Sequence, residues 1–246
     1  MNSNHWLSYF RQNRLNRPEP EWQLPRPGHS PATNALARSL SHFQLGESGE
    51  GRFLLAEAGR SYAHDPDYCE ALDLFIQEEQ EHARLLEKVV LRLGGRLIAQ
   101  HWTHWLFRLL RRALGVHFEI QVLVIAELVG TGYYRLLRCR STDPVILQVC
   151  DLVLQDEARH VEFHSERFAA NHAEWLPLER AVWAAQFQLL FLGATAVAWL
   201  DHGSALGFLG SSRREFLHEV RSECIRFLAM IEPQRFGASD LKVPAR

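Results

Sequence analysis

One arrangement of ionisable residues occurs twice in this chain, and it restricts the folds that the chain can adopt. In each copy, a lone glutamate is followed by a Glu-x-x-His pair, 32 residues later in the first copy and 30 in the second. The residues are, in order, Glu47, Glu79 and His82, then Glu127, Glu157 and His160. Four carboxylates and two imidazoles at such spacings are what a four-helix bundle uses to hold two metal ions of the iron class.

The two copies also share a helix-start signal. An Asp-Pro dipeptide stands 14 residues before the glutamate of each pair, at 65–66 and at 143–144. Aspartate is a favoured helix N-cap, and proline suits the first helical position. The sequence therefore predicts two copies of one helical hairpin, joined by a long crossover over residues 94–113.

Helical periodicity places the six residues on apolar faces. An α-helix returns to the same side every three or four residues, and on each of the four stripes a charged group interrupts an otherwise apolar series. Unpaired carboxylates in a core cost several kcal/mol each, and four together repel one another. Two divalent cations would cancel that charge, and the mixed oxygen and imidazole donors favour Fe, or Mn at one or both positions. A single Glu-x-x-His alone would more often be a solvated pair.

Some assignments stay open at this stage. Glu50 lies on the same predicted stripe as Glu47 and is an alternative or additional ligand. His164 follows His160 by one turn and is either a satisfied core histidine or a further ligand. Asp156, next to Glu157, is a candidate for orienting a histidine across the bundle. The sequence identifies no catalytic side chain beyond the metal ligands.

Composition narrows the class of protein. The 246 residues are 47% hydrophobic, with a formal net charge of −2 at pH 7, so no nucleic acid partner is expected. Four cysteines form no C-x-x-C pair and are expected to be free, buried thiols. The first residues lack the apolar segment of a signal peptide, which predicts a cytoplasmic protein.

The predicted organisation is all-α. Prolines in the first thirty residues predict an extended N-terminal arm over 1–30, without helix. A di-metal four-helix bundle is expected over 31–171, with its first helix running unbroken to about Ser61. Additional C-terminal helices over 172–246 are expected to pack on the bundle. The apolar stretch 181–200 is long enough to span a membrane, but its glutamines favour a buried helix, with a homodimer contact or a membrane-surface contact as alternatives.

The two motifs resemble those of a known superfamily. Glu78-Glu79-Gln80-Glu81-His82 and Asp156-Glu157-Ala158-Arg159-His160 are similar to the motifs of ferritin-like di-iron carboxylate proteins, among them acyl-carrier-protein desaturases and arylamine N-oxygenases. The resemblance covers about residues 36–168 and implies a ferritin-like four-helix bundle. It implies two iron ions held by the six residues of the repeat, and reduction of O₂ at those ions.

The function expected from this resemblance is that of an O₂-dependent di-iron oxidase or oxygenase. Hydroxylation, desaturation or N-oxygenation of a small or acyl-type organic substrate would fit. An external electron donor is expected, because the sequence has no flavin or iron–sulfur motif. The alternative is a ferroxidase or a peroxide-scavenging protein, which would use the same ligands without an organic substrate.

Overall fold

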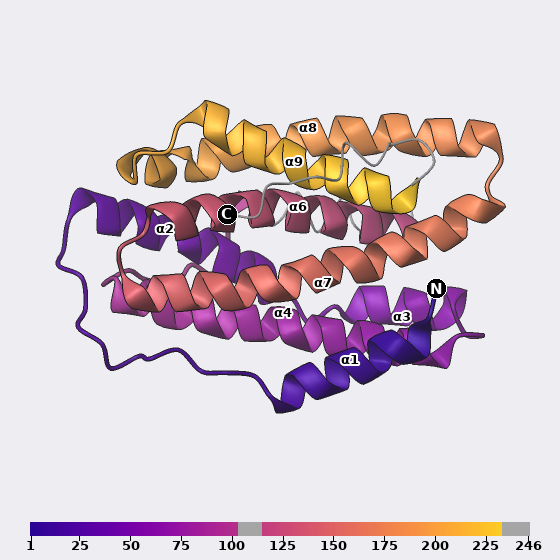
Figure 1. Cartoon of the computed structure of the whole chain (residues 1–246), viewed down its shortest axis with the longest axis horizontal. Helices are drawn as coiled ribbons and strands as arrows, with labels where there is room; N and C mark the ends of the chain where they lie inside the picture. The colour runs from indigo at the N-terminus through magenta and orange to yellow at the C-terminus, as the bar shows by residue number, and fades with distance from the viewer. Residues whose placement is uncertain (103–114, 233–246) are drawn as a thin grey trace.

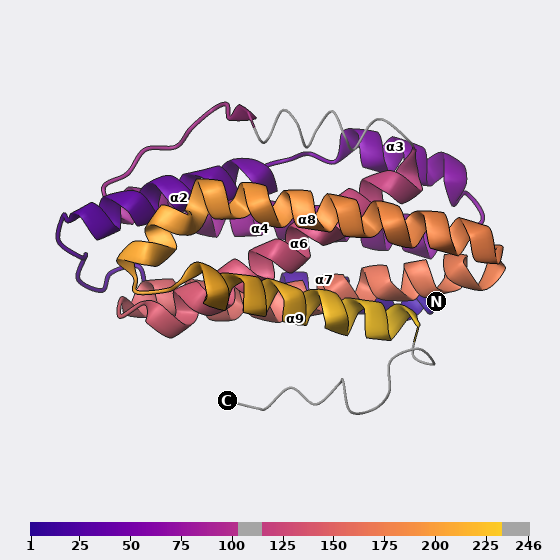
Figure 2. The same ribbon diagram turned by 90° about the horizontal axis from the view of Figure 1, so that it is seen from above.

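The computed structural model describes residues 1–102 and 115–232, and within these ranges the chain is all-α, with no strand. Figures 1 and 2 show long helices lying roughly along one axis. The helices are α1 (Ser3–Leu15), α2 (Pro31–Glu47), α3 (Arg52–Ser61), α4 (Pro66–Arg92), α6 (Val116–Arg140), α7 (Pro144–Glu174), α8 (Pro177–Phe208) and α9 (Arg213–Ile231).

Four of these helices surround the central core. Helix α4 packs against α2 and α7, and α7 packs against α6. Helix α1 lies along the outer side of α4, while α8 and α9 cover α6, with α8 also touching α2 and α9 touching α7. The core between them is a single hydrophobic cluster that includes Leu40, Phe75, Ile120 and Val153.

Capping explains where the main helices begin. The carboxylates of Asp65 and Asp143 accept hydrogen bonds from backbone N–H groups in the first turns of α4 and α7. Ser30 and Ser212 cap α2 and α9 in the same way. A side-chain acceptor at these positions satisfies backbone donors that have no partner within the helix. The helix starts predicted at both Asp-Pro pairs are confirmed.

The prediction of an arm without helix over 1–30 is wrong for its first half. Residues 3–15 form α1, which begins at Asn2, where the side chain accepts a hydrogen bond from the N–H of His5. All prolines of this segment come at position 18 or later, so none interrupts α1. Trp6, Leu7 and Phe10 are buried, and packing of this apolar stripe holds the helix in place.

The rest of the arm, residues 16–30, is extended as predicted. It is tied to the body of the molecule by Arg92, a buried residue at the end of α4. The Arg92 guanidinium donates hydrogen bonds to the carbonyl oxygens of Trp22, Leu24 and Pro25. Glu19 pairs with Arg84 and Lys88 on the exposed side of α4.

The helix predicted to run unbroken to Ser61 is interrupted. Helix α2 ends at Glu47, α3 begins at Arg52, and Gly51 between them has a φ of 59°. Such a positive φ is readily available only to glycine, so Gly51 permits the chain to change direction directly after Glu47. As a result Glu50 leaves the predicted inner stripe.

Helix α8 differs from the predicted buried helix. Both α6 and α8 are long and apolar enough to cross a membrane, but 83% of the relevant window is buried in α6 and only 22% in α8. One face of α8 packs inward through Trp183, Phe187 and Phe191. The opposite face exposes apolar side chains, namely Leu178, Val182, Leu189, Leu192 and Leu200.

The remaining sequence predictions concern the cysteines and two segments. All four cysteines are free, as predicted; Cys150 and Cys224 are buried, whereas Cys139 is exposed. The crossover predicted over 94–113 lies outside the described residues from 103 onward, and the C-terminal segment predicted over 172–246 does so from 233 onward.

The break after α2 generates a stability prediction. Replacing Gly51 with alanine forces a side chain into the left-handed region, and its Cβ would lie 2.3 Å from Cδ1 of Ile76. We expect Gly51→Ala to lower the free energy of unfolding by about 1–3 kcal/mol, measured by urea denaturation. Gly59→Ala is the matched control, since Gly59 is exposed inside α3 with open space around it, and should stabilise by about 0.5–1 kcal/mol. Equal effects of both substitutions would contradict the role given to Gly51.

Candidate metal centre

Each of the four central helices contributes to one cluster of ionisable side chains. Glu47 is the last residue of α2, and Glu127 lies in the middle of α6. The two Glu-x-x-His pairs lie on facing helices, Glu79 with His82 on α4 and Glu157 with His160 on α7. Because α4 packs on α7, the two pairs meet in the core.

The two pairs are interleaved. Nδ1 of His82 lies 3.6 Å from Oε1 of Glu79 and 3.5 Å from Oε1 of Glu157. Nδ1 of His160 lies 2.9 Å from Oε1 of Glu79 and 3.9 Å from Oε2 of Glu157. Both glutamates therefore face both histidines. Donor atoms of Glu79, His82 and Glu157 all lie within 4.8 Å of one another, so this buried group can hold a metal ion.

The lone glutamates of the repeat complete the cluster. Burial raises the pKa of Glu47 well above its ordinary range, and the neighbouring carboxylates of Glu79, Glu157 and Glu127 raise it further. Burial likewise raises the pKa of Glu157, reinforced by the charges of Glu79 and Glu127. These mutual effects mean that all four carboxyl groups share one region of low dielectric.

Several polar atoms of this region lie close to one another but lack a well-oriented hydrogen bond among the described residues. No properly oriented hydrogen bond reaches Nδ1 of His82 or His160, either carboxylate oxygen of Glu127, Oε1 of Glu79 or Oε2 of Glu157. Buried polar atoms are normally satisfied, and leaving so many without partners in one place would be costly. A group of carboxylate oxygens and imidazole nitrogens at these distances fits divalent transition-metal ions.

The pKa shifts of two members of the cluster favour opposite charges in the metal-free protein. Burial lowers the pKa of His160, but contacts with Glu78 and Glu79 outweigh burial and raise it well above its usual value. For Glu79, burial raises the pKa, but the adjacent His160 outweighs burial and lowers it far below the ordinary range. A proton on His160 thus supplies positive charge beside the carboxylates, as a bound metal cation would.

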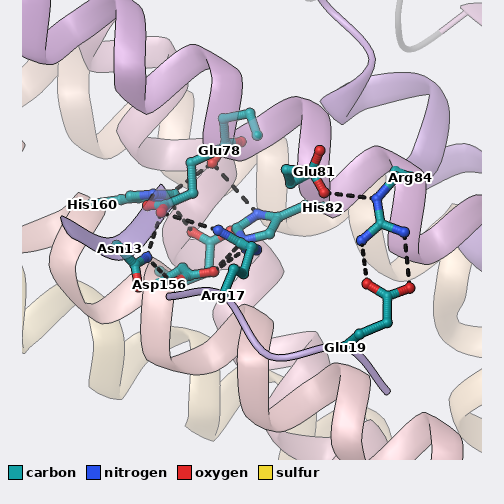
Figure 3. Close-up of polar contacts among 11 residues, drawn as sticks. Asn13, Arg17, Glu19, Glu78, Glu81, His82, Arg84, Asp156 and His160 are labelled. Atoms are coloured by element: carbon teal, nitrogen blue, oxygen red, sulfur yellow. Dashed lines mark hydrogen bonds and ion pairs between the residues drawn. The ribbon is translucent and has the colours of Figure 1, made fainter. Parts of the chain in front are cut away.

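Two further acids contact the histidine rings at Nε2, the nitrogen that points away from the glutamates. Nε2 of His82 is 3.0 Å from Oδ2 of Asp156, and Nε2 of His160 is 2.8 Å from Oε2 of Glu78. Each acid directly precedes the glutamate of the opposite pair in sequence, so the contacts cross between α4 and α7 (Figure 3). An N–H at Nε2 that donates to the acid leaves the Nδ1 lone pair directed at the carboxylate cluster.

The N-terminal segment completes this outer layer. Arg17 pairs with both Glu78 and Asp156, and the amide of Asn13 donates to the same two carboxylates (Figure 3). Both acids are buried, at 5% and 4% exposure, so the guanidinium offsets charge that water cannot reach. Sequence reasoning missed Arg17 and Asn13, because nothing in a proline-rich arm signals contact with a site 60 or more residues away.

The structure resolves most of the open alternatives. Glu50 points to solvent and pairs with Arg52, away from the cluster. The remaining charged residues of the two motifs, Glu81 and Arg159, form exposed ion pairs with residues of their own helices. His164 is fully buried, with Nε2 3.4 Å from Oε1 of Glu127.

A cavity adjoins the carboxylate side of the cluster. It has a volume of about 200 Å³, and all four glutamates line it, while neither His82 nor His160 does. The rest of its wall is mostly apolar and includes Phe43, Leu54 and Phe75. Gly46, Gly49, Gly51 and Gly130 also line it, whereas Gly132 packs against the backbone of Val220. The four glutamates thus lie between the hydrogen-bonded histidines on one side and the apolar cavity on the other.

Comparison of the chain with protein-family models, with curated proteins and with solved structures finds no match. The class defined by fold and site is therefore an all-α protein with a buried carboxylate and histidine group that can hold metal.

The outer acids generate a prediction for metal binding. We expect Glu78→Gln and Asp156→Asn each to weaken binding of Fe²⁺ about 10- to 100-fold, because each removes the charged acceptor that orients one histidine ring. Anaerobic titration followed by calorimetry measures this affinity. Glu81→Gln is the matched control, since Glu81 lies on the same helix but pairs with Arg84 at the surface, and should leave the affinity unchanged. Equal loss in all three variants would count against the outer acids.

The raised pKa values generate a prediction for pH. The pKa values of His160, Glu47 and Glu157 are all raised, so the metal-free protein favours the protonated form of each group. A metal ion must displace these protons, so its binding should release protons and its affinity should rise as pH rises from about 6 to 8. Calorimetry in buffers of different ionisation enthalpy counts the protons. Metal uptake without proton release would show that these groups are not ligands.

Proposed function

We propose that this protein is a di-iron oxidoreductase that uses O₂ to oxidise a small organic substrate. The observation that carries the proposal is that four glutamates, two of them buried and two partly buried, line one mostly apolar cavity next to two buried histidines. A site that only stored or oxidised metal would not need an apolar cavity beside its glutamates. The packing of α2, α4, α6 and α7 around the cluster is consistent with the ferritin-like bundle that the two motifs imply.

Under this proposal the six residues of the repeat are the ligands of two iron ions. They are Glu47, Glu79, His82, Glu127, Glu157 and His160. Glu79 and Glu157 each approach both histidines, so these four side chains would hold the metal together. Glu47 and Glu127 would add carboxylate oxygens from α2 and α6. Two ferrous ions would supply the electrons for reduction of O₂, which a single ion could not provide alone.

The surrounding residues have separate tasks. Asp156 and Glu78 fix the tautomer and orientation of the histidines, and Arg17 compensates the charge of both acids. Phe75 stands edge-on against the His160 ring at 4.7 Å between centroids and blocks its rotation. The apolar wall excludes water and so protects an oxidising centre from side reactions.

The size of the cavity bears on the substrate class. About 200 Å³ is below the range typical of drug-sized ligands, so the chamber suits a small organic molecule or one end of an acyl chain. The reaction would be hydroxylation, desaturation or N-oxygenation, with electrons from an external donor. No nucleic acid partner is proposed, and a cytoplasmic location remains a prediction, as does dimer or membrane-surface contact through the exposed face of α8.

Metal analysis tests the ligand assignment. We expect protein loaded anaerobically with Fe²⁺ to retain about two iron ions at the cluster, as in other bundles with this ligand set. Glu79→Ala and His160→Ala should each lose most of that iron, because each removes a donor from the shared site. Glu162→Ala is the control on the exposed side of α7. Full retention of iron by both site variants would overturn the assignment.

A turnover experiment separates the proposal from its rival. Iron-loaded protein is mixed with O₂, a chemical reductant and small aromatic, amine or fatty-acyl compounds, and products are read by mass spectrometry. Narrowing the cavity with Gly130→Leu should reduce product formation while iron content stays normal, since Gly130 lines the chamber and is not a ligand. Rapid oxidation of Fe²⁺ or removal of peroxide, unchanged in Gly130→Leu and with no organic product, would favour the ferroxidase or peroxide-scavenging alternative.

A further inference from the structure

A second cluster of metal-ligating side chains lies on the wall of the same cavity. It combines His42 from α2, His101 from the segment after α4, and Asp201 from α8. Donor atoms of the three residues lie within 4.8 Å of one another. His42 and Asp201 line the cavity together with the four glutamates. None of these residues belongs to the duplicated motif.

The geometry of this cluster is close to that of a binding site. The rings of His42 and His101 are 4.0 Å apart between centroids, and Nδ1 of His101 is 3.8 Å from Oδ2 of Asp201. Donor atoms bound to one tetrahedral ion at about 2.1 Å stand roughly 3.4 Å apart. Small rotations of the three side chains would therefore bring their donor atoms onto one ion.

Hydrogen bonds among the described residues leave one ring nitrogen of His42 unused. Nδ1 of His42 is buried and has no hydrogen-bond partner within residues 1–102 and 115–232. The neighbouring His202 is used differently, because its Nδ1 is 2.9 Å from Oγ of Ser39 and its ring stacks on Phe43. Two imidazoles in near contact would repel if both were protonated, and burial lowers the pKa of His42. His42 is thus held in the neutral form that binds metals.

The donor set selects a class of ion. Two imidazoles and one carboxylate suit zinc, ferrous iron and related divalent transition metals, and not calcium or magnesium, which prefer oxygen alone. Three protein ligands leave at least one coordination position open. All three side chains are partly exposed, so an ion can reach them from solvent.

We propose that His42, His101 and Asp201 form a second metal site, which binds one divalent transition-metal ion at the outer part of the cavity wall. An ion there would join α2, α8 and the chain at residue 101, three segments that are far apart in the sequence. It would stand on the partly exposed side of the chamber whose inner side carries the buried glutamates. This site does not depend on the proposed oxidoreductase function.

The test counts bound ions in a variant whose first metal site, the cluster around Glu79 and His160, is removed by substitution. Full-length Glu79→Ala/His160→Ala protein is titrated with Zn²⁺, and bound metal is measured after removal of free ion. We expect about one ion per chain to remain, and to be lost when His42→Ala and Asp201→Asn are added. Co²⁺ in the same background should give the visible absorption of a site with nitrogen and oxygen donors, absent after the added substitutions. His218→Ala, which removes an exposed histidine of α9, is the control and should retain the ion.

The outcomes separate this inference from the proposed function. The unsubstituted chain should bind about three ions, falling by one in His42→Ala/Asp201→Asn and by two in Glu79→Ala/His160→Ala. If the unsubstituted chain binds two ions and the His42→Ala/Asp201→Asn variant still binds both, the second site is overturned and the first is not. A single ion lost only in His42→Ala/Asp201→Asn would instead overturn the first site. Circular dichroism and thermal unfolding of each variant confirm that it folds, and the milder His42→Gln replaces His42→Ala if it does not.

Discussion

The charge of four inward-facing carboxylates is the constraint on which the rest of the structure depends. Glu47, Glu79, Glu127 and Glu157 come from four different helices, line one cavity and raise the pKa values of Glu47 and Glu157. Hydrophobic packing of the helices brings these groups together, while their mutual repulsion opposes that packing. The raised pKa values of Glu47, Glu157 and His160 favour bound protons, which relieve part of the repulsion. Divalent cations at the unpartnered atoms would relieve more of it and would convert an electrostatic cost into a contribution to folding.

The contacts around the histidines connect the two halves of the repeat. Asp156 of the second half holds His82 of the first, and Glu78 of the first holds His160 of the second. Neither hairpin alone contains a complete set of oriented ligands, so the outer layer couples formation of the site to docking of α4 on α7. Arg17 and Asn13 extend this coupling to the N-terminal segment, since they bridge acids from both helices. Packing of α1 therefore contributes to the site as well as to the core.

Sequence reasoning predicted the features that depend on local pattern. The helix starts at 65 and 143 follow from capping chemistry, and the meeting of the two Glu-x-x-His pairs follows from helical period and duplication. The break after Glu47 was missed, because the apolar stripe continues through it and only the φ of Gly51 reveals the turn. Arg17, and the grouping of His42 with His101 and Asp201, were also missed. These contacts join segments far apart in the chain, which no local pattern encodes.

The position of Glu47 at a helix end strengthens the case for cations. The last carbonyl groups of α2 lack partners within the helix, and the helix dipole places partial negative charge at this end. A carboxylate there meets unfavourable potential from its own helix in addition to that of Glu79, Glu157 and Glu127. A chain selected only for stability would gain by placing a neutral or cationic residue at this position. Glutamate at the end of α2 is therefore best explained by a positive charge bound beside it, on the side where the four glutamates meet the cavity.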